Sequence, residues 1–483
     1  MNQLDLSTIS KRAVAGALSL TFRRVALQAI SFITINLILA RILSVSTLGI
    51  FNIATAAVSF FSFFSDIGLA AAIIQKKDKV TAEDLRTTFT IQETLIVVLT
   101  VVIWFSAPFL AHLYNLNDQG MWLIRALGVS FLITSFKVIP SVLLERELKF
   151  NPLVGVEILE TLTFNVVLLI LVLMKADLAA FSAATLLRAM VGVVTIYLLA
   201  PWKIGFGFSR SSAKVLLNFG IPYQLNSLLS LLKDRLVPLV IAKMIGSVGV
   251  GYVTWAQNLA FLPLEVMNIV IRVSFPTFAR LQEDQKMLKV AVEKSLFLTT
   301  LFLYPMFFGL LALAPSLVAH VVSDKWQPAL PVFYLFSVST FWATLSTTFT
   351  NTLNAIGQIK LTLKLMIFWT VITWILTPLL TIKYGFIGVG ISSAAISFTS
   401  IITIIIVKRF VEVEIWKNIW QPLVASMVMG AIVFYFSQFL VYDTLSLLEM
   451  VIAGAAIYLG LIIILAKDKI SQNLQEVKSA FSN

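Results

Sequence analysis

Apolar runs of about 20 residues recur along this chain from one end to the other. The hydrocarbon core of a bilayer is roughly 30 Å thick, so an α-helix needs roughly 20 mostly apolar residues to cross it. Within that core the backbone must satisfy its own hydrogen bonds, and a helix does so inside one segment. The sequence therefore predicts an all-α integral membrane protein with many transmembrane helices.

The composition excludes the ordinary soluble classes. Of the 483 residues, 59% are hydrophobic and 12% are charged, and the mean hydropathy is +0.94. The segments between the apolar runs are roughly 20 residues or shorter, which leaves no room for a nucleotide-binding or glycosyltransferase domain. The chain also lacks the GxxxxGK[ST] loop that cradles ATP phosphates. We therefore predict a gradient-driven transporter that is not an enzyme and needs no cofactor.

The metal-ligating residue types are scarce. The chain has no cysteine and two histidines, His112 and His320. Each histidine ends an apolar run in a similar setting, which is typical of an interfacial position rather than of a metal pair. We expect no metal site.

Fourteen apolar runs are long enough to cross a membrane. The first six are residues 13–40, 47–74, 87–113, 121–144, 153–174 and 178–200. Six more follow with the same rhythm, at residues 215–242, 250–275, 290–318, 331–353, 361–382 and 387–407. The last two are residues 419–440 and 445–466.

Lysine and arginine predict the orientation, because cytoplasmic loops carry an excess of them. With a cytoplasmic N-terminus, 23 of the 36 basic residues fall in inward segments and the two tails. The six in outward loops are Arg41, Arg125, Lys175, Lys243, Lys325 and Lys383. Both termini are therefore predicted to be cytoplasmic. The net charge of +12 is explained mainly by this orientation, and we expect no nucleic acid partner.

A short segment is repeated. Residues 39–43, LARIL, followed by Gly49, return as residues 241–245, IAKMI, followed by Gly251. Six helices fit within this offset, so both copies enter the membrane from the same side, which indicates a parallel repeat with a binding site between its halves. We predict a six-helix lobe at 1–205, a second at 206–410, two additional helices at 411–466 and a cytoplasmic tail at 467–483.

Ionisable residues inside the predicted helices are the most informative candidates, because charges at bilayer depth are costly and usually face a cavity or one another. The basic set is Arg23, Arg24, Lys137, Arg188, Lys233, Arg235 and Arg272, and the acidic set is Asp66, Glu93, Glu157, Glu160, Asp234 and Glu265. Snorkelling near helix ends is the expected explanation for Arg272, Glu93 and Asp66. Prolines such as Pro140 would bend helices and free backbone carbonyls.

The deep cations predict an anionic substrate, and the planar guanidinium fork suits phosphate best. The predicted substrate-binding residues are Arg23, Arg24, Lys137, Arg188, Lys233 and Arg235. Permanent pairing with Glu157, Glu160 or Glu265 is the alternative role for these cations. If a cation drives transport, a deep carboxylate must bind it, and the candidates are Glu160, Asp234 and Glu265.

Four segments carry a family resemblance. They are LARILSVSTLGIFNIATAAVSFFSFFSDIGLAAAIIQ at 39–75, LLERELKF at 143–150, FPTFARLQ at 275–282 and DKW at 324–326. Together they resemble the Wzx-type polysaccharide flippases of the multidrug/oligosaccharidyl-lipid/polysaccharide superfamily, in their colanic-acid exporter branch.

The resemblance implies export of an oligosaccharide linked to undecaprenyl pyrophosphate across the bacterial inner membrane. A polysaccharide polymerase and a chain-length regulator are candidate partners, together with membrane lipid. A multidrug antiporter of the same fold is one alternative, although the excess of deep arginines disfavours it. A peptidoglycan-precursor flippase is another, and a membrane glycosyltransferase or polymerase is disfavoured because the chain has no large extramembrane loop.

Overall fold

The computed structural model describes residues 27–482 except 66, 77, 79 and 227–235. In this part of the chain the regular structure is helical. The elements in chain order are η1 (Ile33–Leu39), α2 (Ala40–Ile42), α3 (Val45–Ser62), α4 (Leu69–Gln75), α5 (Ala82–Leu113), α6 (Asp118–Ser135), α7 (Val138–Arg146), α8 (Phe150–Leu173), α9 (Asp177–Leu199), α10 (Arg210–Asn226), α12 (Val237–Phe261), α13 (Leu264–Arg280), α14 (Gln285–Ser316), η3 (Leu317–Val322), η4 (Asp324–Ala329), α15 (Leu330–Ala355), α16 (Ile359–Tyr384), α17 (Phe386–Phe398), α18 (Ile401–Val407), α19 (Ile415–Leu440) and α20 (Thr444–Ser482).

Several helices begin at polar residues that cap their free N–H groups. Thr81 and Asp84 form a reciprocal capping box at the start of α5, and the Asn117 side chain accepts a hydrogen bond from the backbone of Gly120 in α6. Asp284 caps α14 in the same way. These residues mark where the chain leaves the aqueous loops, because an uncapped helix end inside lipid would leave donors unsatisfied.

Eleven helices in the described part of the chain are long and apolar enough to cross a membrane. The pair α6 and α7 makes a twelfth span if it counts as one, with a bend of 45° between them. The predicted all-α membrane class is therefore confirmed. The first, second and seventh of the fourteen predicted spans include residues outside the described ranges, so the full count stays a prediction.

The outer surfaces of the helices are apolar. Phe105 on α5, Leu198 on α9 and Ile464 on α20 are each 78% exposed. Large exposed side chains of this kind would be costly against water but cost nothing against acyl chains. The fold thus places its apolar residues both inside the bundle and on its lipid-facing surface.

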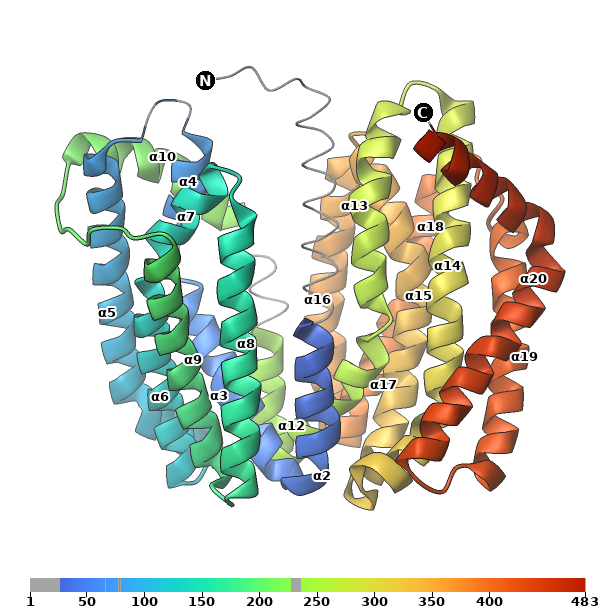
Figure 1. The fold of residues 1–483 in the computed structure, drawn as a ribbon, viewed down its shortest axis with the longest axis horizontal. Coiled ribbons are helices and arrows are strands. Elements are labelled where there is room, and N and C mark those ends of the chain that lie inside the picture. Colours follow the sequence, from blue (N-terminus) through green and yellow to red (C-terminus); the bar gives the residue numbers. More distant parts are fainter. Residues whose placement is uncertain (1–26, 66, 77, 79, 227–235, 483) are drawn as a thin grey trace. The chain divides into compact units, whose positions relative to one another are not determined.

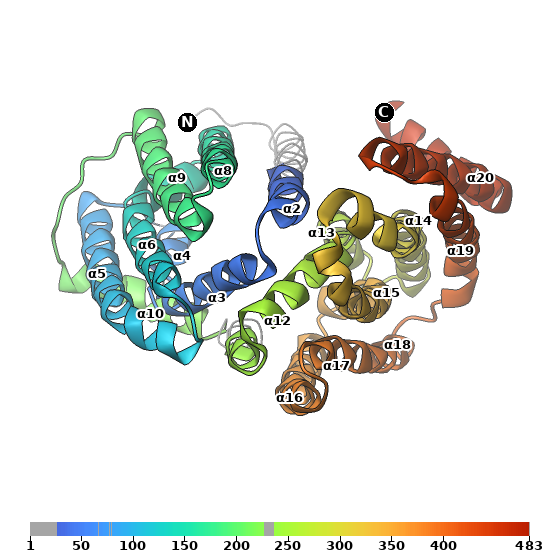
Figure 2. The same cartoon turned by 90° about the horizontal axis from the view of Figure 1, so that it is seen from below.

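The chain divides into two compact units, Met1–Gly251 and Tyr252–Asn483. In the first unit α5, α6, α9 and α8 follow one another side by side, as Figure 1 and the end-on view of Figure 2 both show. This order places α6 and α9 in the interior of the row, where a polar side chain can be removed from lipid. The predicted lobe boundary after residue 205 stays a prediction.

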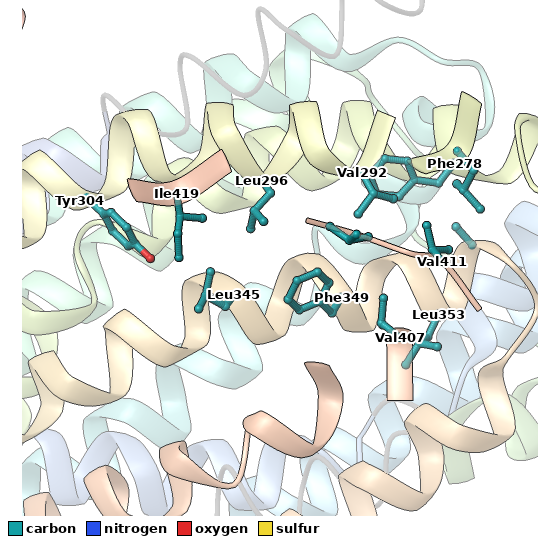
Figure 3. Close-up of a cluster of buried hydrophobic side chains, with 13 residues drawn as sticks. Phe278, Val292, Leu296, Tyr304, Leu345, Phe349, Leu353, Val407, Val411 and Ile419 are labelled. Carbon is teal, nitrogen blue, oxygen red and sulfur yellow. The ribbon is translucent and has the colours of Figure 1, made fainter. Parts of the chain in front are cut away.

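The second unit is built around α14 and α15, with α13, α18 and α19 packed against them. Figure 3 shows Val292 and Leu296 of α14 pointing toward Leu345 and Phe349 of α15. Phe349 is fully buried in this cluster. Burying such a side chain stabilises the packing by roughly 1.5–3 kcal/mol on transfer scales, although in lipid the gain comes mainly from close packing.

In the first unit α3 crosses α12 at very short range. A Cβ atom on Gly49 would lie 1.8 Å from the carbonyl oxygen of Ser247, and one on Gly251 would lie 2.4 Å from that of Val45. Only glycine permits such an approach of two helix backbones. Directly before Ser247, α12 is interrupted at Gly246, whose φ of +67° is a conformation that other residues adopt only with strain. This interruption falls in the predicted loop between the seventh and eighth spans.

Candidate functional site

Five of the nine predicted site residues lie outside the described residues: Arg23, Arg24, Lys233, Asp234 and Arg235. The structure places Lys137, Glu160 and Arg188 in the first compact unit and Glu265 in the second. The three residues of the first unit belong to one region, around the break between α6 and α7. We take this region as the candidate site.

The break between α6 and α7 has a local cause in the sequence. Pro140, in the first turn of α7, has no N–H and so cannot donate to the carbonyl of Phe136, four residues earlier. The Tyr197 hydroxyl of α9 donates to that free carbonyl instead, at 3.1 Å. An unsatisfied carbonyl here would be costly, so Tyr197 stabilises the bend.

Lys137 stands at the break and forms an ion pair with Glu160 of α8. The Glu160 residue is 5% exposed, and the Lys137 side chain is partly buried. Removing either partner would leave the other charge uncompensated at a site of low polarity, which is far more costly than the pair itself is stabilising. The structure thus joins two residues that were predicted for different roles, substrate binding and ion coupling, and those roles stay predictions.

Gly192 of α9 makes room for the Glu160 carboxylate. A Cβ atom on Gly192 would lie 1.8 Å from Glu160 Oε1. The glycine therefore lets the carboxylate fit against the α9 backbone, where any side chain would displace it. Nothing in the sequence distinguished Gly192 from other glycines of apolar helices, because its partner is 32 residues away.

Glu93 of α5 is also buried here, at 5% exposure. The Ser135 side chain, at the last residue of α6, lies with its Oγ 2.9 Å from Glu93 Oε2. Its burial and this partner differ from the snorkelling expected for Glu93. The reason is that α5 begins five residues earlier than the predicted span, which places Glu93 three turns inside the helix.

Arg188 lies midway along α9 and is exposed. Its guanidinium carbon lies 5.8 Å from the centroid of the Phe164 ring of α8, a weak cation–π contact. Within the described part of the chain no carboxylate pairs with it. Glu265 lies in the first turn of α13 and is half-buried. The positive end of the helix dipole stabilises a negative charge at this position.

The candidate site therefore holds one ion pair, one further buried carboxyl group and one exposed guanidinium near mid-span. Sequence reasoning missed Tyr197, Ser135 and Gly192 as parts of it. Pro140 was the available signal, because a proline inside an apolar run predicts a free carbonyl that needs a donor. Among the described residues, no group of three or more histidine or acidic side chains converges as metal ligands would.

The fold is similar to those of known membrane transporters. It resembles the lipid II flippase MurJ in an inward closed conformation, with a TM-score of 0.73 over 94% of this chain and 100% of that chain, at 14% identity. It also resembles the multidrug transporter DinF-BH of the MATE type, with a TM-score of 0.55 over 84% of this chain and 97% of that chain, at 17% identity. At these identities the likeness is one of fold.

The sequence comparison then identifies the family. The model of the polysaccharide biosynthesis protein family matches residues 38–331, more than half of the chain, and the chain belongs to this family. The lipopolysaccharide biosynthesis protein WzxC of Escherichia coli (strain K12) is 24% identical over 407 residues, which are 81% of this chain and 80% of WzxC.

Two further relatives come from other bacteria. The succinoglycan biosynthesis transport protein ExoT of Rhizobium meliloti (strain 1021) is 24% identical over 440 residues, 89% of this chain and 87% of ExoT. The teichuronic acid biosynthesis protein TuaB of Bacillus subtilis (strain 168) is 27% identical over 284 residues, 58% of each chain. The predicted resemblance to polysaccharide flippases is thus confirmed.

Proposed function

We propose that this protein is a flippase that moves oligosaccharide repeat units, linked to undecaprenyl pyrophosphate, across the bacterial inner membrane for surface polysaccharide synthesis. In this proposal it is a transporter and not an enzyme. The observation that carries the proposal is its family membership together with an exposed guanidinium at mid-span, Arg188.

The charge of Arg188 requires a compensating anion or water. A cation at mid-membrane depth costs several kcal/mol unless it is hydrated or paired. Lys137 has Glu160 as its partner, whereas Arg188 has only the face of Phe164 in the described structure. A pyrophosphate entering an aqueous cavity would supply the missing anion and two charge-assisted hydrogen bonds to the planar fork.

The complete arrangement is part of the proposal. It comprises fourteen transmembrane helices in two six-helix lobes and two C-terminal helices, with both termini in the cytoplasm. Arg23, Arg24 and either Lys233 or Arg235 complete the anion site with Arg188, and the polyprenyl chain stays in lipid. The positive-inside distribution of the basic residues supports this orientation.

The likeness to MurJ favours a second candidate, a flippase for a peptidoglycan precursor, because that fold match covers nearly the whole chain. Both substrates share a polyprenyl pyrophosphate, so the cationic site alone does not separate them. The named relatives favour the polysaccharide substrate, because the names of WzxC and ExoT both refer to the biosynthesis of a polysaccharide.

Deleting the gene in its own host separates the candidates. We expect loss of the surface polysaccharide and accumulation of the undecaprenyl-pyrophosphate-linked repeat unit, both reversed by the intact gene. Accumulation of peptidoglycan precursor with lysis would support the second candidate instead. Normal polymer with raised sensitivity to drugs would overturn the proposal in favour of a multidrug antiporter.

A variant pair tests the anion site in the same strain. Arg188→Gln should abolish export while the protein accumulates normally, and Arg188→Lys should restore it in part, because lysine keeps the charge but loses the fork. Arg210→Gln is the matched control, since Arg210 is exposed at the first residue of α10. Unchanged export by Arg188→Gln would remove Arg188 from the site.

A further inference from the structure

Ser135 has a hydrogen-bond geometry that constrains the protonation of Glu93. Its Oγ lies 2.6 Å from the carbonyl oxygen of Leu132 and 2.9 Å from Glu93 Oε2. A serine hydroxyl carries a single proton, and a carbonyl oxygen and an ionised carboxylate are both acceptors only. With Glu93 ionised, the two acceptors would therefore have to share one proton, so neither short contact would hold a full hydrogen bond.

A protonated Glu93 resolves both contacts. The carboxylic acid donates to Ser135 Oγ, and the serine donates its own proton to Leu132. Each of the two short contacts of Ser135 then holds its own hydrogen. An ionised Glu93 would instead be a buried charge with a single neutral donor, which is among the most costly arrangements in a protein interior.

Among the residues that the structure describes, the groups around Glu93 offer no compensating cation. Tyr197 of α9 lies near Glu93, and its hydroxyl proton is donated to the carbonyl of Phe136. A phenol group supplies no cation. Lys137, two residues beyond Ser135, is paired with Glu160. On α5 itself Arg86 lies two turns before Glu93 and packs against Gly205 and Gly207 in the segment after α9.

Aromatic rings cover the turn of α5 that precedes Glu93. Phe89, four residues earlier, is 1% exposed, and its ring centroid lies 6.0 Å from Phe136, 5.1 Å from Trp202 and 5.5 Å from Phe206. This cluster separates the carboxyl group from the loop that follows α9. On this side, water reaches the carboxyl group only if these rings, or the helices that carry them, move.

We propose that Glu93 is a proton-binding site, and that its proton joins α5 to the end of α6 at the bend between α6 and α7. Releasing the proton to water leaves a carboxylate that competes with the Leu132 carbonyl for the single Ser135 proton and draws in water or a cation. The hydrogen-bond pattern that joins α5 to the bend is then changed, because the serine proton turns from Leu132 toward Glu93. In a transporter, which is the proposed function on which this last step rests, such a site couples proton binding to a change of conformation.

The first test reads the proton directly and does not depend on transport. Infrared spectra of the full chain reconstituted in liposomes should show the carbonyl band of a protonated carboxylic acid at neutral pH. Glu93→Gln should remove that band, whereas Glu83→Gln, an exposed residue of the same helix, should leave it. Gln can donate to Ser135 as the acid does, so this variant should fold.

Two results would overturn the proton site: a band unaffected by Glu93→Gln, or no band in the intact chain. Ser135→Ala should shift the band, because the acid loses its acceptor, and an unshifted band would place the proton elsewhere.

Flipping of lipid-linked oligosaccharide under an imposed proton gradient is the second readout. Glu93→Gln should lose the gradient dependence, and retained dependence would reject the coupling. If the intact chain shows the band but flips no such lipid, the proposed function fails and the proton site stands.

Discussion

The hydroxyl groups of Ser46 and Ser247 lie 2.7 Å apart and form a hydrogen bond where α3 crosses α12. The surrounding contacts are reciprocal: Gly49 faces Ser247, and Gly251 faces Val45. Residues 45 and 247, and residues 49 and 251, are separated by the same 202 positions as the predicted sequence repeat. The crossing therefore pairs equivalent positions of the repeat, as a two-fold relation between its halves requires.

Gly49→Ala should disrupt this crossing. The added methyl would overlap the Ser247 carbonyl oxygen, so the two backbones must separate. We expect a loss of roughly 1–3 kcal/mol of stability, typical of overpacking, measured by thermal unfolding in detergent. Gly309→Ala is the control, because a Cβ there has no neighbour within 4 Å. It should be neutral or slightly stabilising, and equal effects of the two variants would contradict the close crossing.

The pair Ser46→Cys and Ser247→Cys should form a disulfide in membranes. The natural chain has no cysteine, so any crosslink that depends on both substitutions reports this contact. If the predicted halves rock against one another during transport, the crosslink should stop export and a reductant should restore it. Each single variant serves as its control. Full export by the crosslinked protein would show that this crossing does not open.

Breaking the ion pair between Lys137 and Glu160 should destabilise the first unit. Lys137→Met or Glu160→Gln leaves one buried group without its partner, and we expect a cost of roughly 3–5 kcal/mol for the more severe single variant. The double variant should be more stable than that single variant, because neither charge remains. Additive costs in this double-mutant cycle, followed by unfolding, would show that the two charges act independently.

Tyr197→Phe should destabilise the bend by roughly 1–3 kcal/mol, the cost of an unsatisfied buried acceptor. The carbonyl of Phe136 loses its donor, since Pro140 provides no N–H. In a Pro140→Ala background the helix can supply that N–H, so the same tyrosine substitution should cost much less. Thermal unfolding of the four proteins measures this coupling, and an equal cost in both backgrounds would rule out the proline as its cause.

Single cysteines should report opposite sides of the membrane at Lys203 and Asp118. Both positions are exposed, in the segment after α9 and at the start of α6. The charge distribution predicts that Lys203→Cys is cytoplasmic and Asp118→Cys is not. An impermeant maleimide added to intact spheroplasts should therefore label only the second. Labelling of both from one side would refute the topology.

The sequence by itself determined the membrane class, the position of most spans and the family. These properties are local: the length and polarity of a segment decide whether lipid can surround it. Capping residues such as Asn117 and Asp284 mark helix ends locally as well, because each side chain accepts hydrogen bonds from backbone N–H groups two or three residues later. The bend at Pro140 was also predictable, because the missing N–H is a property of one residue.

Only the tertiary structure decided which charges meet. Lys137 and Glu160 are 23 residues apart and Glu93 and Ser135 are 42 apart, and the register between packed helices sets both contacts. The same register places Gly192 against Glu160 and Gly49 against Ser247. Helix register depends on how side chains interlock along whole faces, so no short motif predicts that Glu93 is buried beside a serine while Arg188 stays exposed.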